Sequence, residues 1–153
     1  MSENGKLNKF WIQELTRPAF EDWLENEPVP LAIIGIGAIE QHGLHLPLGT
    51  DSLGVEKFIH EVAKETNSVC VHPCWAGYSP HHMAFAGSMT FSWDTLLGIL
   101  MDTIGSLAAH GVKRFIMVNF HGGNTQVFNL AMQLAKREYN VMIAAPEGPK
   151  DTE

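Results

Sequence analysis

Four short apolar runs, separated by segments with a helical pattern, most constrain the fold of this chain. The runs are residues 31–36 (LAIIGI), 68–71 (SVCV), 114–118 (RFIMV) and 141–145 (VMIAA). Continuous apolar runs of this length, bounded by turn residues, are typical of strands buried on both faces. Strands that alternate with helices form βαβ units and a mostly parallel sheet. We therefore expect an α/β fold in which helices cover both faces of the sheet.

The segments between the runs carry helix signals. We expect helices over about residues 17–25, 51–66, 93–110 and 124–139. Thr16 and Ser92 are suitable N-caps for two of them, because short polar side chains accept hydrogen bonds from the exposed N–H groups of a first turn. Thr50 or Asp51 is expected to cap another. Residues 72–91 form a long loop, and long ordered loops in compact domains are often functional.

The composition is that of a globular protein. At 153 residues, 45% of them apolar, the chain has the size of one domain. Its formal net charge of −7 argues against nucleic acid and anionic membrane surfaces as partners. Residues 1–10 are polar, lack the apolar core of a signal peptide and are expected to be loosely held. Cys70 and Cys74 are too few for a four-ligand zinc knuckle and are expected to be free thiols. We therefore expect a cytoplasmic protein without a membrane span.

Potential metal ligands follow the apolar runs. Glu40, His42 and Asp51 come shortly after the first run, and His121 follows the third. Because the carboxyl ends of parallel strands meet at one edge of a sheet, where ligands bind in such folds, we expect these residues to converge. Carboxylate oxygens and imidazole nitrogens bind first-row divalent metals. The sequence therefore predicts a metal site built from these four side chains.

Four such ligands suffice for one ion, or for two if a carboxylate bridges them. Two ions allow one to polarise a carbonyl while the pair acidifies a shared water. Asp51 is the natural bridge, because the start of a helix favours a carboxylate. Taken alone, Asp51 could be only a helix cap and His121 only a buried histidine. His45 is expected to orient a ligand or the loop without binding metal itself.

Other polar residues are predicted near the same edge. We expect His81 and His82, in the long loop, to line the pocket rather than bind metal, and they are the candidates for a catalytic role. Asn124 is a candidate cap for the last helix. Glu147 follows the fourth run; we interpret it as an exposed turn carboxylate, with a ligand role left open.

Three motifs resemble those of the creatininase (creatinine amidohydrolase) family. They are Glu40-Gln41-His42-Gly43 with His45-Leu46-Pro47 and Thr50-Asp51, then Ser79-Pro80-His81-His82-Met83 with Gly87-Ser88-Met89-Thr90, and finally Asn119-Phe120-His121-Gly122-Gly123-Asn124. Their order is that of the family, and the resemblance runs from about residue 30 onwards. It implies a three-layer α/β/α fold, a binuclear zinc or manganese centre, hydrolysis of C–N bonds in cyclic or small amides, and oligomers that are often hexamers.

By position, the resemblance assigns Glu40 and His121 to one metal ion, His42 to the other, and Asp51 to a bridge between them. In creatininase a Glu two residues after the strand-end His completes the second shell, whereas this chain has Gly123 there. Members with the His-Gly-Gly-Asn sequence take this ligand from a later segment. We therefore expect residues 1–153 to form one α/β domain that lacks the family's C-terminal third.

The leading hypothesis is a metal-dependent hydrolase that opens a small cyclic amide or related C–N bond with a metal-activated water. One alternative is a non-catalytic or partner-completed subunit of a split enzyme, and another is a metal-dependent lyase or isomerase acting on a keto sugar. The expected partners are a small-molecule substrate and either further copies of the chain or a second chain that supplies the missing part. Zn²⁺ or Mn²⁺ is expected, and Fe²⁺ is compatible with the same ligands.

Overall fold

The computed structural model describes residues 5–146, and its centre is a parallel sheet. The strands are β1 (Leu31–Ile36), β2 (Val69–Val71), β3 (Arg114–Asn119) and β4 (Met142–Ala144), in the spatial order β2-β1-β3-β4. All three pairings between them are parallel, and β1 pairs with β3 along its whole length. The strands predicted from the four apolar runs are confirmed, with ends that differ by no more than one residue.

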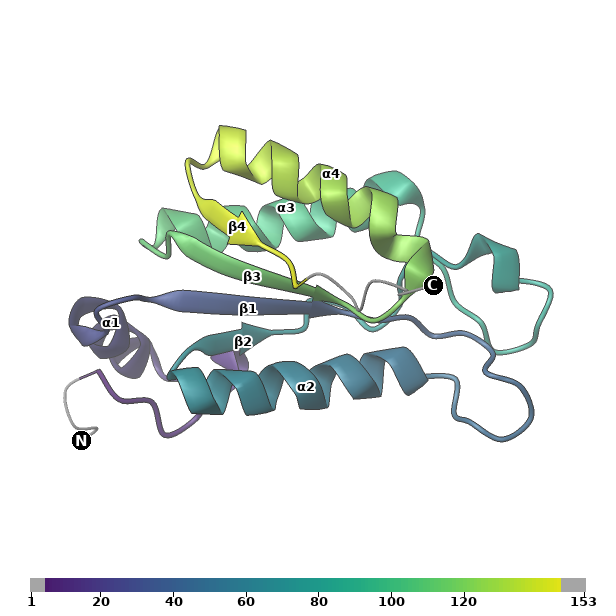
Figure 1. The fold of residues 1–153 in the computed structure, drawn as a ribbon, viewed down its shortest axis with the longest axis horizontal. Coiled ribbons are helices and arrows are strands. Elements are labelled where there is room, and N and C mark those ends of the chain that lie inside the picture. The colour runs from purple at the N-terminus through teal and green to yellow at the C-terminus, as the bar shows by residue number, and fades with distance from the viewer. Residues whose placement is uncertain (1–4, 147–153) are drawn as a thin grey trace, which may run out of the picture.

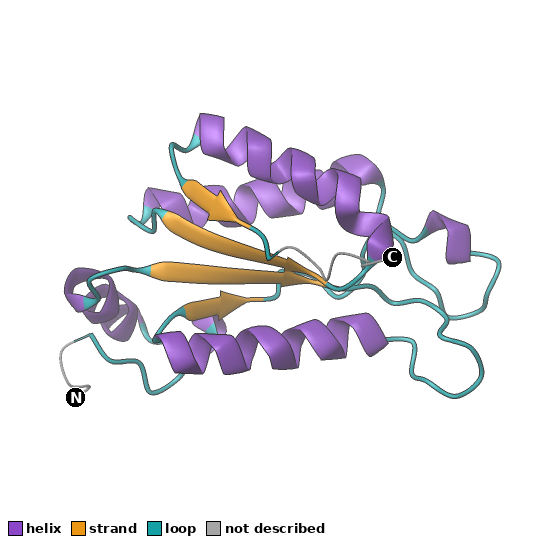
Figure 2. Ribbon diagram, viewed as in Figure 1, coloured by secondary structure: helices purple, strands orange, loops and turns teal. Residues whose placement is uncertain are grey.

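Helices cover both faces of this sheet (Figure 1). The helix α2 (Thr50–Thr66) lies on one face, and α3 (Trp93–Ala109) and α4 (Thr125–Glu138) lie on the other. Ile33 of β1 packs in the α2 layer and Ile34 in the α3–α4 layer, because successive side chains of a strand point to opposite faces. Figure 2 shows the resulting three layers, which confirm the predicted α/β/α fold. Among the described residues, no helix is long and apolar enough to cross a membrane.

Two predicted helix caps are present. Thr16 precedes α1 (Arg17–Asn26), and its hydroxyl accepts a hydrogen bond at 3.4 Å from the backbone N–H three residues later. Ser92 does the same for α3 at 3.3 Å. Each bond satisfies one of the N–H groups that a helix leaves unpaired in its first turn.

The start of α2 differs from the prediction. Its N-cap is Gly49, which has no side chain to accept a hydrogen bond. Thr50 instead donates its hydroxyl to the carbonyl of Pro47 at 2.6 Å, inside the preceding loop. The prediction that Thr50 or Asp51 caps the helix is therefore wrong, because the side chain of Asp51 is directed to other partners.

The segment before α1 is held more firmly than its polar composition suggested. Leu7 is buried, and its backbone N–H donates to the side chain of Asn67 at 2.8 Å. Asn67 ends α2 in a left-handed conformation, and its backbone carbonyl accepts a hydrogen bond from the indole N–H of Trp23 at 2.7 Å. The expectation of a loose segment is therefore wrong for residues 5–10, whose anchors lie about 60 residues away in the chain.

The two cysteines give a testable property of the fold. Both are free; Cys70 is buried in β2 and Cys74 is half-buried in the following loop. Burial raises the pKa of Cys70 to about 12 and that of Cys74 to about 11. Since the thiolate is the reactive form, alkylation at about pH 8 should be at least about 100-fold slower in the native protein than in the unfolded chain. Rapid labelling of both thiols without denaturant would contradict this packing.

Candidate metal centre

Four polar side chains from three segments meet at the carboxyl edge of the sheet. Glu40 follows β1, and its backbone N–H donates to the carbonyl of Leu48 at 2.9 Å, which closes the loop that carries His42. Asp51 lies in the first turn of α2, and His121 directly follows Phe120 at the end of β3. Glu40 and His121 are buried, at 6% and 5% exposure. The convergence expected from strand order is therefore present.

The two carboxylate oxygens of Asp51 face two different histidines. Oδ1 lies 3.0 Å from Nε2 of His42, and Oδ2 lies 3.3 Å from Nδ1 of His121. The same Nδ1 lies 3.2 Å from Oε1 of Glu40. Two donors that bind one tetrahedral ion at about 2.1 Å lie about 3.4 Å from each other. The separations therefore fit ligands that share ions, with Asp51 between the two histidines.

The hydrogen bonds of His42 and His121 place the proton of each ring on the nitrogen that faces away from the carboxylates. Nδ1 of His42 lies 3.1 Å from the carbonyl oxygen of Glu40, and Nε2 of His121 lies 3.1 Å from that of Tyr78. A carbonyl only accepts, so these nitrogens carry the protons in the neutral rings. The other nitrogen of each ring then presents a lone pair to a carboxylate. A proton or a metal ion between the two groups would satisfy both, and the arrangement is also the pattern of metal-binding histidines.

The electrostatic field at His42 favours positive charge. Burial lowers the pKa of His42, but the carbonyl of Glu40 and the carboxylate of Asp51 raise it by more, so that it lies above its ordinary value. The shift shows that the surroundings attract a proton to Nε2. A divalent ion at the same place would gain from the same field.

One buried oxygen of Glu40 also fits a cation site. Oε2 has no hydrogen-bond partner and almost no contact with solvent. Leaving such a group unpaired costs roughly 1–3 kcal/mol, and more when it is charged. Coordination of an ion is one way in which a buried carboxylate is satisfied. The ligand atoms of Glu40, Asp51 and His121 all lie within 4.8 Å of one another.

The remaining predicted residues lie at different distances from this cluster. The exposed ring of His81 stacks on His121, with centroids 5.9 Å apart and planes 5° apart. Nε2 of His82 lies 3.4 Å from Oε2 of Glu40, so a second group of possible ligand atoms consists of Glu40, His81 and His82. His45 is exposed, and within residues 5–146 it has no hydrogen bond or ion pair to the cluster. Glu147 lies outside the described residues.

Asn124 has a role that the sequence did not indicate. It is fully buried and makes no cap bond to α4, so the predicted cap is wrong. Its Oδ1 accepts from the backbone N–H of Tyr78 at 2.8 Å, and its Nδ2 donates to the carbonyl of Gly37 at 2.9 Å. Asn124 therefore joins the loop after β1 to the long loop, which carries the carbonyl that orients His121.

Replacing Asn124 should destabilise the fold. Asn124→Ala leaves the buried polar groups of Tyr78 and Gly37 without partners, and we expect the free energy of unfolding to fall by about 2–4 kcal/mol. Urea denaturation measures this change. The matched control is Thr125→Ala, at the exposed next position, which should cost about 1 kcal/mol or less. Equal stability of the two variants would contradict the bridging role.

Gly123 leaves no space for a side chain. A Cβ at this position would lie 2.3 Å from the carbonyl oxygen of Tyr78 and 2.4 Å from Nε2 of His121. Both contacts are far below normal separations, and the backbone oxygen cannot rotate away. The position at which creatininase is expected to carry a metal-binding Glu is therefore closed to a side chain here.

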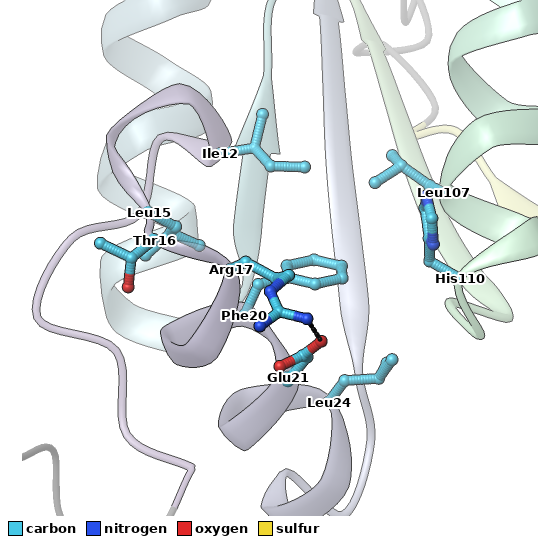
Figure 3. A pocket seen from close by; sticks show the side chains of 9 residues that line it. All are labelled: Ile12, Leu15, Thr16, Arg17, Phe20, Glu21, Leu24, Leu107 and His110. Carbon is cyan, nitrogen blue, oxygen red and sulfur yellow. Dashed lines mark ion pairs between the residues drawn. The ribbon is translucent and has the colours of Figure 1, made fainter.

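A separate hollow lies at the opposite end of the sheet (Figure 3). It has a volume of about 440 Å³ and lies between α1 and the end of α3, near the amino ends of the strands. Its wall is largely apolar, with contributions from Ile12, Leu15, Phe20, Leu24 and Leu107. Arg17 and Glu21 form an ion pair of 3.5 Å at this hollow. It belongs to the packing of α1 and contributes no group to the cluster.

The fold and the cluster together define a class: a parallel α/β protein with carboxylate and histidine ligands gathered at the carboxyl edge of its sheet. Comparison with known families agrees with this description. The chain belongs to the creatininase family, since the model described as creatininase (creatinine amidohydrolase) matches residues 13–152. The resemblance seen in the motifs is confirmed.

Curated relatives carry the names of different hydrolases. A mycofactocin precursor peptide peptidase of Mycolicibacterium smegmatis is 31% identical over 118 residues, which are 72% of this chain and 47% of that protein. Creatinine amidohydrolase of Pseudomonas putida is 29% identical over 111 residues, 69% of this chain and 43% of that protein. A 3-dehydro-scyllo-inosose hydrolase of Thermotoga maritima is 31% identical over 93 residues, 60% of this chain and 30% of that protein.

Solved creatininases share the fold. A manganese creatininase superposes with a TM-score of 0.80 at 26% identity, over 90% of this chain and 58% of that one. A zinc–zinc form of a creatininase variant gives 0.78 at 25% identity, over 91% of this chain and 58% of that one. The chain thus spans less than half of the length of these curated relatives and somewhat more than half of the solved structures.

Proposed function

We propose that this chain carries the metal centre of a hydrolase that opens a small cyclic amide or a related C–N bond. The observation that carries the proposal is the orientation of His42 and His121. Each ring donates its proton to a backbone carbonyl and turns a lone pair toward one oxygen of Asp51. Membership of a family whose relatives are named as hydrolases supports the reaction class.

The proposed ligand roles follow these contacts. Glu40 and His121 would hold one ion, His42 the other, and Asp51 would bridge the two. When bound, such ions polarise a substrate carbonyl and lower the pKa of a water. Zn²⁺, Mn²⁺ and Fe²⁺ all suit carboxylate and imidazole ligands. The carboxylates of Glu40 and Asp51 would offset the positive charge that the ions introduce.

The substrate would approach from the exposed side of the cluster. His81 is exposed while stacked on His121, and we propose that it contacts the substrate or exchanges a proton with it. The relatives are named for creatinine, an inosose and a peptide, so the family name alone does not select a substrate. A small cyclic amide is the choice favoured by the motif resemblance. The free thiols are compatible with the proposed cytoplasmic location.

Product analysis in heavy-oxygen water tests the reaction class. The purified chain, loaded with Mn²⁺ or Zn²⁺, would be incubated with creatinine and a set of small lactams and imides. Hydrolysis must place one solvent oxygen in the product, which mass spectrometry detects. A product without solvent oxygen would indicate a lyase or isomerase instead. Metal binding without any turnover would support the non-catalytic or partner-completed subunit.

We also propose that the centre is completed by another copy of the chain or by a second chain. The closed position at Gly123 motivates this proposal, because it removes one expected ligand. Large apolar side chains of the two loops near the cluster are exposed, which is typical of association surfaces. They are Leu44, Leu46, Met83, Phe85 and Met89. Native mass spectrometry should find two ions per chain only in an assembly, and a monomer holding two ions tightly would contradict the proposal.

A further inference from the structure

We propose that Gln41 holds His82 in the tautomer with its proton on Nε2, so that the ring presents an N–H to the otherwise unpartnered Oε2 of Glu40. In this arrangement His82 is a positioning residue for a metal ligand and is not itself a ligand. The positioning role rests on the proposed function, whereas the tautomer depends only on side chains of this chain.

The amide of Gln41 has a defined orientation. Its Oε1 accepts the backbone N–H of Gly43 at 3.0 Å, in a turn where Gly43 has a φ of +71°. A backbone N–H only donates, so the amide oxygen has to face it. The amide nitrogen of Gln41 consequently faces His82, and its distance to Nδ1 of that ring is 3.2 Å. The usual ambiguity between the two ends of a glutamine amide does not arise here.

This orientation determines the proton position on His82. An amide NH₂ only donates, so Nδ1 of His82 has to accept and carries no proton. In the neutral ring the proton then lies on Nε2. That nitrogen is 3.4 Å from Oε2 of Glu40, slightly longer than the usual N–H···O bond, and Oε2 has no hydrogen-bond partner, so the two groups make an electrostatic contact. The side chains of His82 and Glu40 are 21% and 8% exposed, so water competes only weakly.

Glu40 belongs to two groups of possible metal ligands, one with Asp51 and His121 and the other with His81 and His82. The tautomer of His82 decides between them. A protonated Nε2 has no lone pair for a metal, so the group with His81 and His82 is the poorer site. In the other group, Nδ1 of His121 has its lone pair directed at Glu40 and Asp51. Oε1 of Glu40, 3.2 Å from Nδ1 of His121, would then bind the ion, and the N–H of His82 would face Oε2 and limit rotation of the carboxylate. Contacts of this kind orient metal-binding carboxylates.

Nuclear magnetic resonance of the metal-free chain tests the tautomer directly. In a long-range proton–nitrogen spectrum of the histidine-labelled protein, His82 should show a bare Nδ1 and a protonated Nε2, with its signals assigned by their loss in His82→Gln. Gln41→Met removes the donor and should shift His82 toward a mixture of tautomers. The matched control, Gln133→Met on the exposed face of α4, should leave the pattern unchanged. A protonated Nδ1 in the native chain, or no response to Gln41→Met, would overturn the proposal.

Zinc affinity of two His82 variants tests the positioning role. His82→Leu removes the N–H and should weaken Zn²⁺ binding by about 10–100-fold. His82→Gln keeps an N–H near the position of Nε2, so its affinity should stay within a few-fold of the native value. Equal losses in the two variants would indicate a direct ligand and overturn the proposal. If the native chain showed the expected tautomer but bound no zinc, the proposed function alone would fail.

Discussion

Asp51→Ala should strip the chain of its bound divalent metal. Asp51 is the residue whose two oxygens face both His42 and His121, so its removal takes a ligand from each proposed ion. The two histidines would then share the site with Glu40 alone. Metal analysis after dialysis should find no more metal than in the buffer, whereas His42→Ala should lose mainly one of two ions.

The control for this prediction is Asp94→Ala. Asp94 also lies in the first turn of a helix, so both substitutions remove a similar favourable interaction with the helix dipole, worth about 0.3–1 kcal/mol. Of these two aspartates, only Asp51 belongs to the cluster of proposed ligands. Full metal retention by Asp51→Ala, or equal metal loss by both variants, would show that the assignment of Asp51 is wrong.

Gly37→Ala should both destabilise the fold and weaken metal binding. A Cβ at Gly37 would lie 2.4 Å from the backbone nitrogen of Ser52 and 2.6 Å from the carbonyl carbon of Asp51. These are backbone atoms of the first turn of α2, so the helix itself has to move. We expect the free energy of unfolding to fall by about 2–3 kcal/mol. Because Asp51 moves with the helix, Zn²⁺ affinity measured by calorimetry should fall as well.

Gly98→Ala is the matched control. Gly98 lies inside α3, and a Cβ there would meet nothing within 4 Å. Alanine is a better helix former than glycine, so this variant should gain about 0.5–1 kcal/mol without any effect on metal binding. Urea denaturation distinguishes the two outcomes. A Gly37→Ala protein as stable as the native chain would mean that the contact between this loop and α2 is looser than described.

The fold could be predicted well because its signals are local. Each strand is a short apolar run between turn residues, and each main helix is an apolar pattern of adequate length, so both were recognised within two residues of their ends. The errors concern contacts between distant segments. The anchoring of Leu7 by Asn67 and the bridge made by Asn124 depend on side chains that meet only after folding.

The sequence alone determined which donor groups are available and which end of the sheet carries them. Glu40, His42, Asp51 and His121 follow strands or begin a helix, and parallel strands bring such positions to one edge. Only the tertiary structure decided how the groups face each other. The two oxygens of Asp51, the orientation of the rings and the contact of Gln41 with His82 depend on distances between loops, which strand order does not specify. Hydrogen bonds require donor and acceptor within about 3.5 Å, so the chemistry of the site depends on the packed loops.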